Sequence, residues 1–340
     1  MLKKLMFAAA ACAACAGAPA AFAAGGPMAL GASASPPMGP GPGTVFFVDP
    51  TAMTLRTAAF AKAGTPAGNS FYAAYDAASG TVYVPSPVGT ITMMNAATGA
   101  RIGAFPTIRG ARVARVLAQR KLLVVLSART VAAYALGSHA PVFTLAVGGN
   151  AIAVNPSESE IYVGGNMDRT VTAIAVPSGR VTTTYPVARS GDLVFAGGNL
   201  FSADIKTGVM SVVDTANGKV TRIKTSEVDP HFAYTAILKA TAGFMQAAAS
   251  PGGHTVYVAG FSGHILKFSA APAKYLGEIA VRPAKGANKL SGLAIVDGGK
   301  EALVTIENRD EAALVSLADG RIVHLFPGVS SNRWVAAPGK

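Results

Sequence analysis

The sequence predicts an all-β protein, a seven-bladed β-propeller with four-stranded blades. Short β-prone runs separated by turn residues recur along the chain at an interval of about 40 residues, which is the length of one propeller blade. The segment from Gly148 to Val187 shows the unit: its four runs carry apolar residues at every second position, the period of a strand. Turn residues separate the runs, as at Asn155-Pro156-Ser157 and Pro177-Ser178-Gly179.

Copies of this unit lie on both sides of the segment. Tyr83 in Val-Tyr-Val stands about two blade lengths before Tyr162, and a run from Leu122 occupies the position between them. Later copies of the same run begin at Asn199, Thr255 and Ala302. The turn before the outermost run also recurs, and each copy ends in a glycine that suits a tight hairpin: Thr98-Gly99, Ser178-Gly179, Asn217-Gly218 and Asp319-Gly320.

The repeat resembles a known family. The pattern Ala-Ile-Ala-Val-Asn-Pro, then Ile-Tyr-Val-Gly-Gly-Asn, then Val-Thr-Ala-Ile is similar to the YVTN-type repeats of bacterial and archaeal seven-bladed propellers. The name-giving tetrapeptide is present only as the variant from Tyr162 to Asn166. The resemblance covers the chain after about Thr44. It implies the fold more than the function, because this scaffold carries many functions.

The N-terminal residues 1–23 have the pattern of a secretory signal peptide. Lys3 and Lys4 precede an apolar stretch, and Ala21-Phe22-Ala23 is a small-x-small cleavage site. Both cysteines of the chain lie inside this segment, so the mature protein would have no disulfide, thiolate metal site or cysteine nucleophile. We therefore expect a periplasmic or secreted protein. No later apolar run reaches the length of a membrane span, so none is expected after signal cleavage.

The remaining chain divides into a leader and one domain. Residues 24–43 are rich in Gly, Pro and Ala and are expected to be a flexible leader with one short strand near Met28. Residues 44–340 would form the propeller, with an insertion at 225–243. The run from Thr44 resembles a third strand and the run at Trp334 a first strand, so a blade shared between the N- and C-terminal strands would close the ring. Six further blades are expected to start near Gly68, Ile108, Gly148, Ala188, Ala240 and Gly286.

Basic residues gather in one set of loops. The chain has 29 Lys and Arg against 17 Asp and Glu, a formal charge of +12. Loops after the second and fourth strands of every blade share one face of a propeller, and arginine presents a planar fork suited to carboxylate or phosphate. The candidate ligand-binding residues in these loops are Arg109, Arg112, Arg189, His231, His264 and Arg309. In the alternative interpretation, acidic neighbours such as Asp192 and Asp310 simply neutralise the arginines.

The sequence contains no recognised catalytic or metal-binding motif. It lacks a Gly-x-Ser-x-Gly elbow, a phosphate loop and a His-Glu-x-x-His pattern, so no metal or cofactor is expected. The basic residues are scattered, which disfavours nucleic acid as a partner. We therefore expect a binding or scaffolding protein for an anionic small molecule or an acidic periplasmic protein. The alternatives are a propeller subunit of a periplasmic oxidoreductase, similar to amine-dehydrogenase propellers with a partner-supplied redox group, and a lactonase-like hydrolase with no identified acid–base set.

Overall fold

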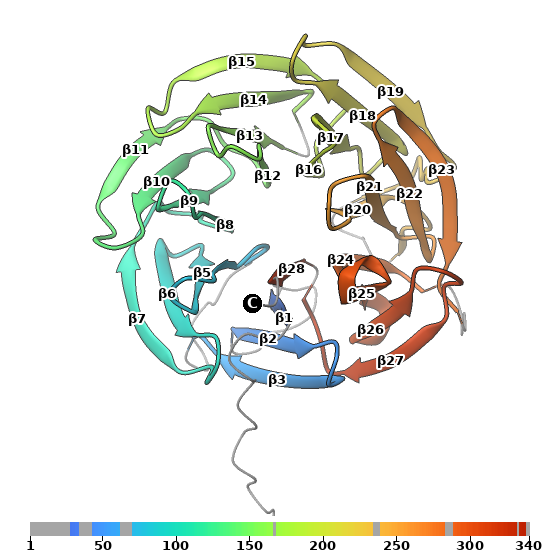
Figure 1. Cartoon of the computed structure of the whole chain (residues 1–340), viewed down its shortest axis with the longest axis horizontal. Coiled ribbons are helices and arrows are strands. Elements are labelled where there is room, and N and C mark those ends of the chain that lie inside the picture. The colour runs from blue at the N-terminus through green and yellow to red at the C-terminus, as the bar shows by residue number, and fades with distance from the viewer. Residues whose placement is uncertain are drawn as a thin grey trace, which may run out of the picture.

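The computed structural model describes residues 28–33, 43–61, 70–165, 168–233, 239–282, 288–331 and 333–337. These residues form seven four-stranded antiparallel sheets arranged as blades around a central channel (Figure 1). The predicted fold, a seven-bladed β-propeller, is confirmed. The expected signal segment 1–23 and the expected blade starts near Gly68 and Gly286 lie outside the described residues. No helix in the described ranges is long and apolar enough to span a membrane.

Both ends of the chain contribute to blade 1. Its strands, from the channel outwards, are β28 (Trp334–Ala337), β1 (Met28–Ala32), β2 (Thr44–Asp49) and β3 (Thr54–Ala59). The predicted shared blade is therefore confirmed, and the run from Thr44 is its third strand. β28 pairs with β1 rather than with β2, with Leu30 opposite Val335. All five residues of β1 are buried, because this strand lies between β28 and β2 and its side chains pack against both neighbouring blades.

Blades 2 to 7 follow one another in sequence and in space. The strands of blades 2, 3 and 4 are β4 (Ala74–Asp76), β5 (Thr81–Ser86), β6 (Thr90–Asn95), β7 (Arg101–Pro106), β8 (Val113–Leu117), β9 (Leu122–Leu126), β10 (Val131–Ala135), β11 (Pro141–Leu145), β12 (Ala151–Val154), β13 (Glu160–Gly164), β14 (Thr170–Ala175) and β15 (Val181–Pro186). The first strand of each blade lies nearest the channel and the fourth at the rim (Figure 1).

The strands of blades 5, 6 and 7 are β16 (Asp192–Ala196), β17 (Asn199–Ala203), β18 (Val209–Asp214), β19 (Val220–Lys224), β20 (Phe244–Ala249), β21 (Thr255–Gly260), β22 (His264–Ala270), β23 (Ala273–Ala280), β24 (Leu290–Val296), β25 (Glu301–Ile306), β26 (Glu311–Ser316) and β27 (Ile322–Pro327). Two short 3-10 helices, η2 (Asp297–Gly299) and η3 (Glu307–Arg309), flank β25. The connection from β19 to β20 spans residues 225–243 and is the longest between two blades.

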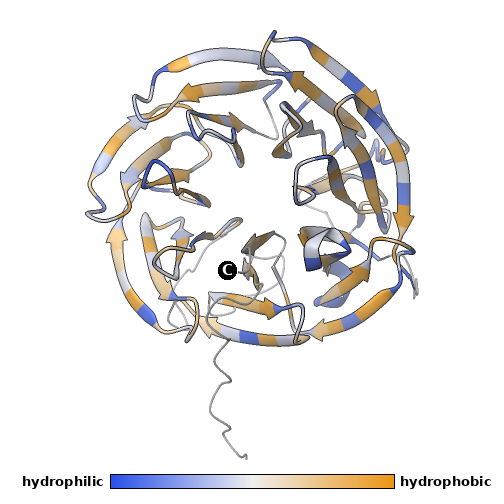
Figure 2. Ribbon diagram, viewed as in Figure 1, coloured by the Kyte–Doolittle hydropathy of each residue, from blue (hydrophilic) through white to orange (hydrophobic). Residues whose placement is uncertain are grey.

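Alternating side chains pack each blade against both of its neighbours. In β13, Ile161 and Val163 join the apolar cluster shared with blade 3, whereas Tyr162 between them joins the cluster shared with blade 5. All three are almost completely buried. The predicted strand phase at Ile161 is therefore confirmed, and the core is a series of layers between sheets. Figure 2 shows apolar residues along the inner strands of the blades, with hydrophilic residues in connections and interspersed in the outermost strands.

Antiparallel connectivity gives the ring two different faces. The connections after second and fourth strands lie on one face, called the upper face below, and the hairpins after first and third strands lie on the other, the lower face. The turn between β6 and β7 on the lower face has Gly99 at φ 73°, as the sequence pattern predicted. Each first strand runs from the upper face downwards, so its first residues surround the upper mouth of the channel.

Candidate functional site

The six residues proposed from the sequence all lie on the upper face. Arg109 and Arg112 are in the connection from β7 to β8, Arg189 in that from β15 to β16, His231 in that from β19 to β20, His264 at the start of β22 and Arg309 in η3. They belong to connections of different blades and are spread around the ring. None of them lines the cavity in the channel. The structure therefore groups them by face, without gathering them into one pocket.

Two of these arginines have distinct surroundings. Arg109 is exposed to solvent. Arg112 is half-buried, its guanidinium carbon lies 5.8 Å from the ring centre of Phe71, and its Nε is buried without a hydrogen-bond partner. Arg112 therefore packs back onto the blade, while Arg109 contributes charge to the surface.

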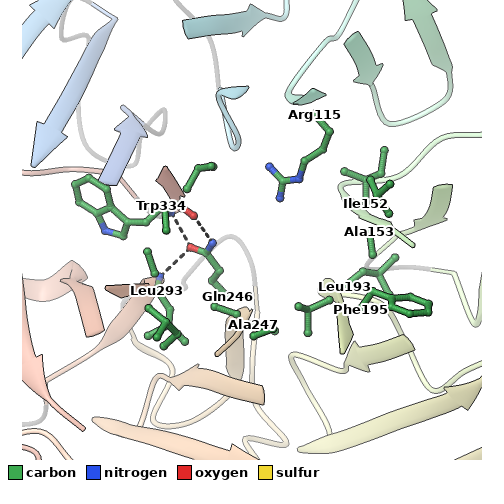
Figure 3. Close-up of a pocket in the computed structure, with 17 residues that line it drawn as sticks. Arg115, Ile152, Ala153, Leu193, Phe195, Gln246, Ala247, Leu293 and Trp334 are labelled. Carbon is green, nitrogen blue, oxygen red and sulfur yellow. Dashed lines mark hydrogen bonds between the residues drawn. The ribbon is translucent and has the colours of Figure 1, made fainter. Parts of the chain in front are cut away.

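The channel contains a cavity of about 360 Å³. The first strands of six blades supply its walls, which are mostly aliphatic (Figure 3). The lining residues are Arg115, Ile152, Ala153, Val154, Leu193, Val194, Phe195, Gln246, Ala247, Ala248, Ala249, Leu293, Ala294, Ile295, Trp334, Val335 and Ala336. Arg115 is the one charged side chain in this set.

Gln246 joins three first strands at the cavity wall. Its Oε1 accepts hydrogen bonds from the backbone N–H of Trp334, at 2.7 Å, and of Leu293, at 2.8 Å. Its Nε2 donates to the backbone oxygen of Trp334 at 2.6 Å (Figure 3). The amide thus connects β20, β24 and β28 across the gaps between blades. Because these bonds use both ends of the amide, Gln246 acts as a brace of the wall.

Arg115 is the charged group that faces the cavity. Figure 3 shows its guanidinium extending from β8 into the space opposite Trp334 and Gln246. The guanidinium carbon lies 3.9 Å from the ring centre of Tyr72, a cation–π contact that fixes the orientation of the fork. Nη1 donates one long hydrogen bond, of 3.3 Å, to the backbone oxygen of Ala114. A guanidinium has five N–H donors, so most of its donor capacity remains for a ligand.

A buried polar cluster lies beside Arg115 at the upper mouth. Asp192, 1 % exposed, accepts hydrogen bonds at Oδ2 from the Tyr72 hydroxyl, at 2.7 Å, and from the Ala247 N–H, at 2.9 Å. Its Oδ1 is buried without a hydrogen-bond partner. Arg333, also buried, lies 5.8 Å by its guanidinium carbon from the ring centre of Tyr72.

Burial dominates the protonation of this cluster. Desolvation raises the pKa of Asp192, against the opposing effects of Arg333, its hydrogen bonds and Arg115. Desolvation likewise raises the pKa of the buried Glu307, although Arg333 opposes it. Burial also raises the pKa of the Tyr72 hydroxyl, which therefore stays protonated and donates to Asp192. Burial thus raises the pKa of both carboxyl groups.

No group of three or more histidine, cysteine or carboxylate side chains in the described ranges could surround a metal ion. His231 is exposed, and its backbone N–H donates to Oδ1 of Asp229 at 2.8 Å, so it belongs to a turn of the 225–243 connection. Trp334 is 1 % exposed and is a core residue. Its indole Nε1 donates to Oγ1 of Thr305 at 2.8 Å.

The channel site was not among the residues selected from the sequence. The signal for it was present as single polar residues inside apolar first strands: Arg115 in Val-Ala-Arg-Val-Leu and Gln246 in Phe-Met-Gln-Ala. A polar residue in such a run must face either a partner or a cavity. Loop residues alone do not reveal this site.

Known proteins resemble this chain in structure but not in sequence. No model of a known protein family and no curated protein sequence matches the chain, so the YVTN-type resemblance has no match among families. Hydrazine synthase of Kuenenia stuttgartiensis is similar in structure, with a TM-score of 0.61 and 13 % identity, over 75 % of this chain and 78 % of that one. A protein from Lactobacillus plantarum has a TM-score of 0.66 and 15 % identity, over 92 % of this chain and 99 % of that one. At such identities these similarities show the propeller fold alone.

Proposed function

We propose that this protein binds a small organic anion in its central channel. Arg115 would hold the anionic group, and the aliphatic walls would hold the rest of the ligand. The observation that carries the proposal is the position of Arg115, the one charged side chain among the residues that line a cavity of about 360 Å³. Ligand pockets are mostly apolar, with a few placed polar groups, and occupy about 300–1,000 Å³.

The electrostatics of the mouth support an anion over a cation. Arg115 and Arg333 lie around Tyr72, and the two nearby carboxyl groups have raised pKa values. A guanidinium presents a planar pair of donors to a carboxylate, and charge-assisted hydrogen bonds of this kind are stronger than neutral ones. The wall residues Ile152, Leu193 and Ile295 favour an apolar body on the ligand. A short fatty acid or an aromatic carboxylate has both features.

The basic upper face would assist this binding from a distance. The chain carries a formal charge of +12, and Arg109, Arg129 and Arg169 are exposed on that face. Charged surfaces of this kind speed the encounter with ligands of opposite charge and are screened by salt. In this proposal the arginines named from the sequence steer the anion, whereas Arg115 holds it.

The single tryptophan gives a direct test. Trp334 is the one Trp of the chain and lines the cavity, so its fluorescence can report occupancy. We expect a saturable change in Trp334 fluorescence when hexanoate is added and no change with hexan-1-ol at the same concentration. Arg115→Gln should weaken hexanoate binding at least about tenfold, because a hydrogen bond to a charged group contributes about 1.5–3 kcal/mol. Arg109→Gln, on the exposed surface, is the matched control and should leave the affinity unchanged.

Two results would contradict the channel site. The first is hexanoate affinity that is the same in Arg115→Gln as in the unchanged protein. The second is anion binding that is lost in the double variant Arg189→Glu, Arg309→Glu and is steeply weakened by salt, which would place the site on the upper face and favour an acidic protein partner. In our proposal this double variant slows association and has a small effect on affinity at physiological ionic strength.

We further propose that the protein works in the bacterial periplasm or outside the cell. The support is the signal pattern of residues 1–23. The mass of the protein isolated from its native host tests this: cleavage after Ala23 would remove residues 1–23. A mass that includes Met1 to Ala23 would refute export by this signal.

A second candidate function is a propeller subunit of a periplasmic oxidoreductase. The observation that favours it is the structural similarity to hydrazine synthase, whose name denotes an enzyme. Any redox group would then come from a partner chain, because the sequence has no cysteine beyond Cys15. Isolation of the native complex followed by visible spectroscopy separates the two candidates: a chromophore that copurifies at fixed stoichiometry supports the subunit.

A further inference from the structure

A histidine and a carboxylate face each other at the outer part of the upper face, on blade 6. His264 begins β22, and Glu278 lies on the adjacent strand β23. The distance from Nε2 of His264 to Oε1 of Glu278 is 3.8 Å. This separation is too long for a hydrogen bond, which needs about 2.7–3.2 Å. Both side chains are partly exposed, at 32 % and 38 %, so solvent ions reach them.

A hydrogen-bond chain fixes the tautomer of His264. The buried Glu227 accepts the Ser262 hydroxyl proton at Oε2, at 2.6 Å. Because that proton points at Glu227, the Ser262 oxygen must accept the hydrogen bond that joins it to Nδ1 of His264, at 2.9 Å. Nδ1 therefore carries the proton. In neutral His264 the lone pair is on Nε2, directed at the Glu278 side.

The other partner, Glu278, accepts two longer hydrogen bonds at its far oxygen. Oε2 of Glu278 accepts a hydrogen bond from the Tyr275 hydroxyl at 3.2 Å and another from the Ser226 hydroxyl at 3.5 Å. Burial and the Glu278 charge raise the pKa of Tyr275 to about 12, so this hydroxyl remains a donor. Oε1 is left facing His264. In the neutral form of His264, the Nε2 lone pair and Oε1 of Glu278 thus point into the same gap, whereas protonated His264 would form an ion pair with Glu278 there.

We propose that this gap binds a divalent transition metal ion such as Zn²⁺, with Nε2 of His264 and Oε1 of Glu278 as its protein ligands. Zinc bonds to both donor types are about 2.0–2.2 Å, which puts tetrahedral ligands about 3.4 Å apart, so the partly exposed side chains need move only a few tenths of an ångström. Imidazole and carboxylate suit zinc. Ligating histidines usually donate their other N–H to a fixed acceptor, as His264 does to Ser262.

The site is open, with two protein ligands and positions left for water. It also joins the 225–243 connection to blade 6, because Ser226 and Glu227 of that connection hold the two ligands through hydrogen bonds. Metal binding would therefore stabilise the connection against opening. The proposal is independent of anion binding in the channel, since none of its residues lines the cavity.

Calorimetric titration with ZnCl₂ on protein without a histidine tag tests the site. We expect one equivalent to bind, with affinity reduced at least about tenfold in His264→Ala and in Glu278→Gln, and about 10–100-fold in Ser262→Ala, which removes the acceptor for His264 Nδ1 and also the donor to Glu227. His254, exposed in the turn between β20 and β21 on the lower face, provides the control His254→Ala with unchanged affinity. Amide exchange at Ser226 and Glu227 should slow when Zn²⁺ is added.

Absence of stoichiometric binding would overturn the site, as would affinity that His264→Ala and Glu278→Gln leave unchanged. Unchanged affinity in Ser262→Ala would overturn the proposed role of the hydrogen-bond chain. Circular dichroism melting of each variant separates loss of the site from loss of the fold, and His264 and Glu278 are exposed enough for their replacement to be tolerated.

Discussion

The hydroxyl of Tyr72 donates a 2.7 Å hydrogen bond to Oδ2 of Asp192, 120 positions further along the chain. Tyr72 precedes β4 in blade 2, and Asp192 opens β16 in blade 5. The bond therefore spans the upper mouth of the channel between blades that are not neighbours. Contacts of this kind hold the ring in register across its centre, where strand pairing cannot reach.

Loss of this bond should destabilise the fold. Tyr72→Phe keeps the ring beneath Arg115 and removes only the donor to a buried carboxyl, so we expect the free energy of unfolding to fall by about 1.5–3 kcal/mol. Urea denaturation measures this change in the free energy of unfolding. Tyr75→Phe, on the half-buried Tyr75 of β4, is the control and should change the value by less than about 0.5 kcal/mol. Equal effects of the two replacements would show that the bond contributes nothing.

The raised pKa of Asp192 and of Glu307 makes stability depend on pH in a defined direction. Between the ordinary carboxyl pKa, about 4, and the raised values, the folded state holds more protons than the unfolded state. The free energy by which these two carboxyl groups stabilise the folded state is therefore fully present below the ordinary pKa. It is lost as the pH rises through the raised pKa values. Urea denaturation from pH 4 upwards should show this decline, and the double variant Asp192→Asn, Glu307→Gln should show a flatter profile. If these two groups instead stabilised the folded state more as the pH rises, the raised pKa values of Asp192 and Glu307 would be wrong.

Replacing the brace Gln246 should separate three first strands. Gln246→Leu leaves the backbone N–H groups of Leu293 and Trp334 without their acceptor, and an unsatisfied buried group costs about 1–3 kcal/mol. We expect the free energy of unfolding to fall by at least about 2 kcal/mol. Gln119→Leu, on an exposed turn, is the matched control with little effect. A Gln246→Leu variant that unfolds at the same urea concentration as the unchanged protein would refute the role of the amide.

The layer between blades 3 and 4 should respond strongly to truncation at Ile161. Ile161→Ala removes buried methyl groups from this layer and should cost about 2–5 kcal/mol in unfolding free energy. Thr183→Ala on the exposed side of β15 should cost less than about 0.5 kcal/mol. A cost below half a kcal/mol at Ile161 would be at odds with the strand phase.

Closure of the ring predicts a large effect of a small deletion. Removing residues 331–340 takes away β28, exposes the edge of β1 and removes the buried Trp334. We expect a marked fall in melting temperature, measured by circular dichroism, because the inner edge of β1 and the core beneath it become exposed. An unchanged melting temperature would mean that β28 does not contribute to closure.

Sequence predicted the strands well because each one is specified locally. The alternation in Ile161-Tyr162-Val163 and the glycine turns fix strand phase and hairpins within a few residues. The order of strands predicted from the sequence also placed Arg109, Arg189 and Arg309 together on the upper face, where the structure has them. It could not select Arg115, because the partner that orients it, Tyr72, lies on another blade. Sites made by packing of distant first strands require the closed ring before their members can be recognised.

The order of strands in blade 1 also sets the order in which the protein can be completed. During synthesis from the N-terminus, β1, β2 and β3 emerge first, while the strand that covers the inner edge of β1 is made last. Until residues 334–337 have left the ribosome, every nascent chain is an open arc with unpaired β1 backbone at its inner edge. Such edges are prone to pair with other chains. A premature stop near the 3′ end of the message would therefore release association-prone chains with an uncovered β1 edge, although nearly all of the protein had been made.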